Sequence, residues 1–117
     1  MKMTRRMKKI LLVLLHPEKV SQLLEKSNIY VSRVERLDYY PEPYIMLFCA
    51  KMSSWWDFTH SEVVSYRRTF RIMIELGLIH ETYEYRAYKL TAKGRQQAEK
   101  IEKDIRDFIK EYESLVD

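Results

Sequence analysis

The sequence THSEVVSYRRTFRIMIELGLIHETYEYRAYKLTAKG, residues 59–94, decides the fold of this chain. It begins with an amphipathic run in which apolar residues recur every three or four positions, so an α-helix would gather them on one stripe. The residues of this stripe are Val63, Tyr66, Phe70, Met73 and Ile74. The opposite arc is polar and consists of Ser61, Ser65, Arg68 and Arg71. The run therefore predicts a helix with one buried face and one solvent-facing face.

A tyrosine-rich segment, HETYEYRAYKL, follows this helix and predicts a β-hairpin. Gly77 stands where the helix would end in the left-handed conformation, which glycine adopts without the steric penalty of a side chain. Thr91 precedes the next helical run and can cap it, because a threonine hydroxyl accepts a hydrogen bond from a first-turn amide. The order of elements is therefore helix, hairpin, helix.

Two phrases in this region resemble the core of winged-helix transcription regulators of the MarR and PadR type. They are ELGLI at residues 75–79 and YKLTAKG at residues 88–94, separated by the hairpin. The resemblance implies that the first helix reads DNA and that the hairpin is a wing. Small size, a lysine-rich start and scarce glycine are also similar to compact winged-helix proteins of archaea and their viruses or plasmids. Winged helices also serve as protein-interaction modules, so the resemblance bears more on the fold than on the role.

Composition indicates one globular, mostly α-helical domain. The chain has 117 residues, of which 46% are hydrophobic and 32% charged, with two glycines and three prolines. Such a chain is long enough for one core, and scarce turn residues favour long regular elements. The longest apolar runs, residues 10–15 and 44–50, are too short to span a bilayer. We expect a cytoplasmic, nucleoid-associated protein with no membrane partner and with its single cysteine, Cys49, buried.

The positive charge is concentrated in two places. Residues 1–9 contain five basic groups and no acidic group, and residues 59–94 contain six basic and four acidic groups. Residues 95–117 contain five basic and seven acidic groups. Basic patches of this kind suit a polyanion such as DNA, and a dimer would double them. The alternative is that these groups serve solubility alone.

Residues 1–43 form an N-terminal helical segment for packing or dimerisation. Its first helix, ending at His16 and Pro17, is apolar nearly all round, which favours burial in the core or in a dimer interface. Residues 18–26 predict a second helix. Residues 20–37 contain a possible second helix-turn-helix, with its turn at Asn28, and an Arg33 and Arg36 double substitution would test that alternative.

Residues 44–94 form the winged-helix core in this interpretation. Residues 44–52 predict a compact apolar helix, and residues 53–58 leave room for a second helix that is shorter than the family pattern. We expect Trp55 and Trp56 to close the core beneath the DNA-reading helix, the alternative being stacking on a ligand or a base.

Residues 95–117 predict a long C-terminal coiled-coil helix. Apolar residues alternate by fours and threes in a heptad pattern. The pattern starts at Gly94 and continues through Ala98, Ile101, Ile105, Phe108, Tyr112 and Leu115. Such a pattern requires an apolar partner, either the N-terminal helix of the same chain or the same helix of a second subunit. We predict dimerisation through Ala98 and the positions that follow it.

The sequence contains no motif for catalysis, and we predict that the protein is not an enzyme. With glycine only at positions 77 and 94, a glycine-rich phosphate loop cannot form. His16, His60, His80 and Cys49 lack the spacing of metal ligands, so we expect neither a metal nor another cofactor. The acidic residues of the C-terminal run fit a solvated helix face rather than an acid–base pair.

We therefore expect a sequence-specific regulator that binds double-stranded DNA as a homodimer, with any small-molecule effector left open. Ser61, Ser65, Arg68 and Arg71 would face the major groove, and Arg67 would face phosphate. At the tip of the wing, Tyr85 and Arg86 would approach the DNA, while Tyr88 and Leu90 turn inward. Sequence-neutral attraction would come from Lys2, Arg5, Arg6, Lys8 and Lys9. The alternative is a non-enzymatic architectural or protein-interaction module.

Overall fold

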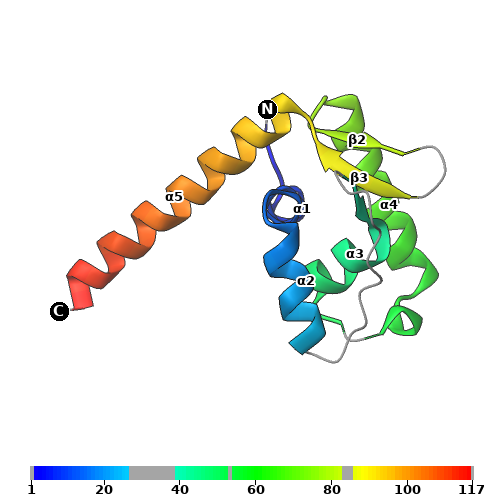
Figure 1. Cartoon of the computed structure of the whole chain (residues 1–117), viewed down its shortest axis with the longest axis horizontal. Coiled ribbons are helices and arrows are strands. Elements are labelled where there is room, and N and C mark those ends of the chain that lie inside the picture. The colour runs from blue at the N-terminus through cyan, green and yellow to red at the C-terminus, as the bar shows by residue number, and fades with distance from the viewer. Residues whose placement is uncertain (1, 27–38, 53, 83–85, 117) are drawn as a thin grey trace.

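A computed structural model describes residues 2–26, 39–52, 54–82 and 86–116, with residues 108–116 described by their backbone alone. It is mostly helical and contains one small antiparallel sheet (Figure 1). In chain order the elements are α1 (Arg5–Leu15), α2 (Pro17–Lys26), β1 (Tyr40–Pro41), α3 (Glu42–Ala50), a 3₁₀ turn (Trp55–Asp57), α4 (His60–Glu75), β2 (Ile79–Glu81), β3 (Ala87–Leu90) and α5 (Ala92–Val116). The expected order of helix, hairpin and helix is confirmed for α4, β2–β3 and α5.

The sheet contains one strand more than the predicted hairpin. Strands β2 and β3 pair antiparallel, with Ile79 opposite Leu90, and β1 pairs with the other side of β3, with Tyr40 opposite Tyr88. The sequence pattern predicts no strand before residue 44, yet β1 contains Pro41. Proline lacks an amide donor and is tolerated on an edge strand, which is the position of β1 in the sheet.

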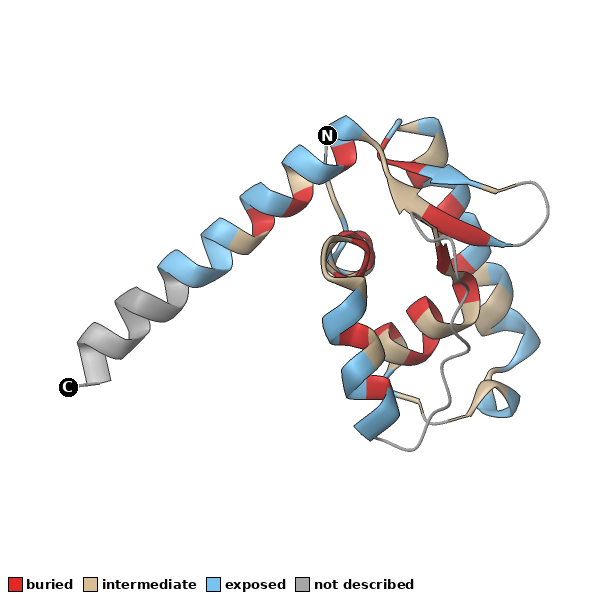
Figure 2. Ribbon diagram, viewed as in Figure 1, coloured by how far each residue is buried: buried red, intermediate tan, exposed pale blue. Residues whose placement is uncertain are grey.

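Helix α1 lies in the core of the chain. Ile10, Leu11 and Val13 have almost no exposed surface, and α1 contacts α3, α4, β3 and α5. Its position between α5 and the rest of the body is visible in Figure 1, and Figure 2 shows buried residues along one side of this helix. Of the two environments expected for this apolar helix, the structure therefore places it in the core.

Two glycines control how α4 and α5 meet the hairpin. Gly77 has φ +73°, so α4 ends in the left-handed conformation as predicted. At the start of α5, the Thr91 hydroxyl accepts a hydrogen bond of 2.9 Å from the Gly94 amide, which confirms the predicted cap. A Cβ at Gly94 would lie 1.9 Å from the carbonyl oxygen of Leu78. Glycine at this position lets α5 pack directly against the backbone that follows α4.

The segment between α3 and α4 differs from the prediction. Helix α3 covers Glu42–Ala50, two residues earlier than expected, and only the 3₁₀ turn stands where a short second helix was expected. Trp55 packs against the core, but Trp56 is 89% exposed, so its predicted role in closing the core is wrong. Successive side chains of a 3₁₀ turn point about 120° apart, so the two neighbouring indoles cannot both face inward.

The possible second helix-turn-helix of residues 20–37 lies largely outside the described residues, as do Arg33 and Arg36. Its first part, residues 20–26, belongs to α2.

Cys49 is buried as expected, and burial raises the pKa of its thiol to about 11. Among the described parts of the chain, we find no helix with both the length and the apolar character needed to cross a membrane.

Candidate nucleic-acid interface

The N-terminus of α4 is fixed by a capping box between Thr59 and Glu62. The Thr59 hydroxyl accepts a hydrogen bond of 3.2 Å from the Glu62 amide, and the Glu62 carboxylate accepts one of 3.0 Å from the Thr59 amide. These hydrogen bonds lower the pKa of the Glu62 carboxyl. They satisfy two amides that a helix start leaves unpaired, so the first turn has a defined position for any contact that it makes.

The rest of α4 separates into a buried and an exposed face, as its sequence predicts. Tyr66, Phe70 and Met73 are buried, and Val63 and Ile74 pack half-buried against the same core. The exposed residues, here called the outer face of α4, are His60, Ser61, Val64, Arg67, Arg68, Arg71, Ile72 and Glu75. The three arginines place positive charge on a helix that lies at the side of the body opposite the C-terminal end of α5 (Figure 1).

Ser65 lies at the border of the outer face and is engaged by α1. The Arg6 guanidinium donates a hydrogen bond of 2.7 Å to the Ser65 hydroxyl. The same guanidinium lies 4.1 Å from the centre of the Tyr66 ring, a cation–π contact. Ser65 is half-buried by this arrangement, and Arg6 adds a fourth arginine beside the outer face. From the sequence, Arg6 is expected to add only sequence-neutral attraction to DNA.

Arg67 lies on the flank of α4 and faces a buried carboxylate. Its Nε is 3.7 Å from Oε1 of Glu42, a residue with 2% exposed surface, while the Arg67 side chain itself is 44% exposed. Within the described residues, this Oε1 has no hydrogen-bond partner. Burial raises the pKa of the Glu42 carboxyl, and the charges of Arg67 and Arg86 oppose that rise. Arg67 therefore compensates a charge inside the protein as well as facing solvent.

The hairpin is joined to α3 and α4 at its base. The Glu42 amide donates a hydrogen bond of 2.8 Å to the Arg86 carbonyl, which ties the start of α3 to β3. Tyr88 turns inward as predicted and stacks on Phe70 with ring centres 4.4 Å apart. Leu90 is half-buried against the core, and Arg86 is exposed. The other predicted residue of the hairpin tip, Tyr85, lies outside the described residues.

Two exposed apolar residues of α4 escaped sequence analysis. Val64 is 39% and Ile72 is 43% exposed, and both belong to the outer face. A count along the helix could have found them, because each residue advances the direction of the side chain by about 100° and Val64 therefore points away from Val63. Trp56, close to the start of α4 in the chain, adds a third exposed apolar side chain.

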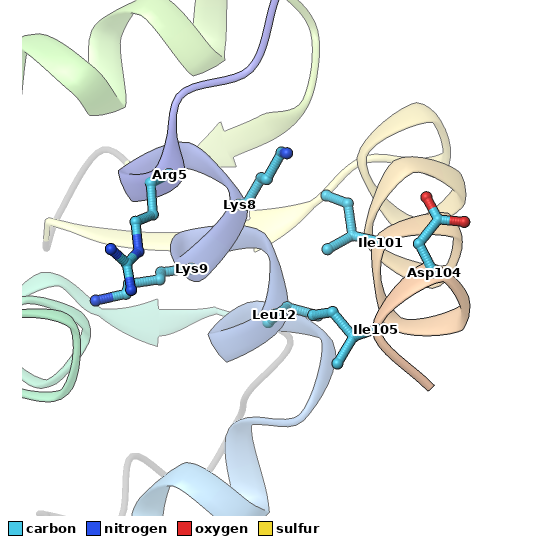
Figure 3. Close-up of a pocket in the computed structure, with 7 residues that line it drawn as sticks. All are labelled: Arg5, Lys8, Lys9, Leu12, Ile101, Asp104 and Ile105. Carbon is cyan, nitrogen blue, oxygen red and sulfur yellow. The ribbon is translucent and has the colours of Figure 1, made fainter. Parts of the chain in front are cut away.

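The basic N-terminal segment is only partly exposed. Lys2, Arg5 and Lys8 are exposed, whereas Arg6 and Lys9 are half-buried. Arg5, Lys8 and Lys9 border an open groove of about 390 Å³ between α1 and α5, and its apolar part is formed by Leu12, Ile101 and Ile105. Figure 3 shows Leu12 of α1 directed toward Ile105 of α5. We call this feature the α1–α5 groove.

The first half of the heptad pattern is used inside the chain. Ala98 is fully buried and Ile101 is 9% exposed, whereas Ile105 is 44% exposed. Between α1 and α5, His16 and Glu102 form a further polar contact, which lowers the pKa of the Glu102 carboxyl. A second chain could therefore reach the heptad positions only from Ile105 onward. The side chains of Phe108, Tyr112 and Leu115 lie outside the description.

In the described ranges, no three His, Cys, Asp or Glu side chains are grouped so that they could bind a metal ion.

Comparison of the chain with protein-family models, with curated proteins and with solved structures gave no match.

Proposed function

We propose that this protein is a sequence-specific regulator that binds double-stranded DNA as a homodimer, with one winged helix-turn-helix in each subunit. The proposal depends above all on the outer face of α4, where three arginines are exposed on a helix with a hairpin joined at its base. A helix with an exposed basic face has the width that the major groove of B-DNA accepts.

In this proposal, Arg68 and Ser61 contact base edges, since both are exposed on the outer face and point away from the core. Arginine can donate a bidentate pair of hydrogen bonds to guanine, whereas serine accepts or donates to several bases. Arg71, which is exposed on the same outer face, also contacts base edges in the major groove. Arg67 and Arg86, which both lie near the buried Glu42, bind backbone phosphates and set the position of α4 in the groove.

The second subunit contacts α5 beyond Ile101. Ile105 is exposed, and the heptad pattern continues through Phe108, Tyr112 and Leu115. Residues 107–117 contain four acidic groups and one basic group, which complements the basic border of the α1–α5 groove. A partner helix with this composition fits a groove that has an apolar floor and a basic edge on α1, with Asp104 on the α5 edge.

A binding selection with a randomised DNA duplex library at moderate salt tests the proposal, with the oligomeric state measured in the same sample. A dimer that enriches a two-fold symmetric site supports it, since two recognition helices about 34 Å apart read one site. Arg68→Ala should then weaken binding to the selected site by about 1–3 kcal/mol. Arg95→Ala removes the same charge from an exposed position on α5 and should leave that affinity nearly unchanged.

A protein-interaction module is the second candidate, favoured by the 89% exposure of Trp56. Exposed tryptophan is unusual on a monomer surface and is enriched at centres of protein interfaces. The same selection separates the two candidates. Strong salt dependence without sequence enrichment indicates an architectural DNA binder, and absence of DNA binding indicates an interaction module.

A further inference from the structure

The outer face of α4 contains two apolar side chains that its positive charge does not explain. Val64 and Ile72 are 39% and 43% exposed, and they lie four residues before and four residues after Arg68. Residues four apart lie on the same side of an α-helix. Val64, Arg68 and Ile72 therefore form one ridge, here called the α4 ridge, with an apolar group at each end and a guanidinium in the middle.

Charged groups surround this ridge. Arg67 and Arg71 flank it on one side, and Arg6 lies beyond it on the other side, where it is bonded to Ser65. Glu75, three residues past Ile72, introduces negative charge and marks the end of the positive region. A hydrophobic patch that binds another protein is usually continuous. The α4 ridge instead presents two separated apolar groups within a positive frame.

The major groove offers a matching pattern. Among base edges, the C5-methyl group of thymine is the apolar feature, and guanine presents two acceptors that suit arginine. We infer that Val64 and Ile72 contact thymine methyl groups on either side of a guanine contacted by Arg68, and so determine the sequence preference of the protein. This inference rests on the proposed DNA-binding function and adds the bases that the site prefers.

The four-residue spacing of Val64, Arg68 and Ile72 limits how far apart the contacted bases can lie in the DNA site. Four residues advance an α-helix by about 6 Å, and one base-pair step is about 3.4 Å. Each contacted thymine should therefore lie about two base pairs from the guanine, on either strand. A full site would contain this arrangement twice, in inverted orientation, if the protein binds as a symmetric dimer.

The experiment uses the full chain and the duplex obtained from the library selection. Each thymine of that duplex is replaced in turn by deoxyuridine, which keeps base pairing and removes only the methyl group. At the contacted positions, affinity should fall about fourfold for each methyl lost, the value expected for one buried CH₂-sized group. Thymines elsewhere in the site should be insensitive to the replacement.

Val64→Ala and Ile72→Ala assign the effect to the ridge. Each variant should lose the sensitivity to deoxyuridine at one position and keep it at the other. Leu23→Ala is the matched control, because Leu23 is an apolar residue on α2 with 49% exposure, and it should keep the wild-type pattern at both positions.

The outcomes separate this inference from the function on which it rests. Sequence-specific binding with no response to deoxyuridine, or a response that both α4 variants retain, overturns the thymine inference and leaves the regulator proposal standing. Absence of any sequence preference overturns both. If DNA binding is absent altogether, a protein partner becomes the explanation for the exposed residues of α4.

Discussion

The guanidinium of Arg67 lies 3.7 Å from the carboxylate of Glu42, and this contact joins the flank of α4 to the buried start of α3. Glu42 is 2% exposed and has an oxygen without a hydrogen-bond partner among the described residues. A buried charge is expensive unless an opposite charge compensates it. Arg67 therefore links the stability of the fold to the position of the helix that we propose to read DNA.

We expect Arg67→Ala to destabilise the protein by about 1–3 kcal/mol at neutral pH, because it leaves a buried acceptor without its charged neighbour. The measurement is urea unfolding of the full chain. In a Glu42→Gln background the same substitution should have little effect, because no buried charge then needs compensation. Equal losses in both backgrounds would show that Arg67 stabilises the fold by some other contact.

The raised pKa of Glu42 predicts a pH dependence of stability with an unusual sign. When the folded pKa of a carboxyl exceeds its unfolded pKa, the folded state binds more protons between the two values, so stability falls as pH rises through that interval. Glu42→Gln removes the titrating carboxyl and should therefore remove this decrease of stability with rising pH. The lowered pKa values of Glu62 and Glu102 act in the opposite direction, so the wild type alone does not isolate the effect.

The test is therefore the difference in unfolding free energy between wild type and Glu42→Gln, measured from acidic to neutral pH. The variant should gain stability relative to wild type as pH rises. A difference that stays constant with pH would show that the Glu42 carboxyl does not change its protonation in this range.

The two glycines predict different losses of stability for the same substitution. Gly77→Ala should destabilise the protein by about 1–2 kcal/mol, because its left-handed backbone is unfavourable for alanine although the space around it is open. Gly94→Ala should destabilise it more, by about 3 kcal/mol or above, because its Cβ would collide with the backbone of Leu78. Thermal unfolding of both variants measures the difference. A smaller loss for Gly94→Ala would show that α5 can move away from Leu78 easily.

Two isoleucines of α5 separate folding from self-association. Ile101→Asp should destabilise the fold by several kcal/mol, since it places a charge against α1 in the core. Ile105→Asp alters an exposed position and should leave thermal unfolding nearly unchanged while weakening the proposed dimer. Sedimentation equilibrium measures the second effect. Unchanged association of Ile105→Asp would exclude this part of α5 from the interface.

The sequence alone determined the local elements of the central region. Regular spacing defined the buried face of α4, and this face packs as predicted because a helix that is apolar on one side must bury that side. Gly77 and Thr91 marked the two ends of the hairpin because their effects are local. Gly77 adopts the left-handed conformation with its own backbone, and Thr91 caps the helix that follows it. The exposed positions of Arg67, Arg68 and Arg71 followed from the same periodicity.

Only the tertiary structure decided which distant residues complete the surface. Arg6 contacts Ser65 across 59 positions of the chain, and Glu42 meets Arg67 from a separate helix. Strand β1 exists because β3 offers it a pairing edge, and Trp56 is exposed because a short turn can direct only one indole inward. Local periodicity does not specify contacts of this kind, because they depend on how separate elements pack together.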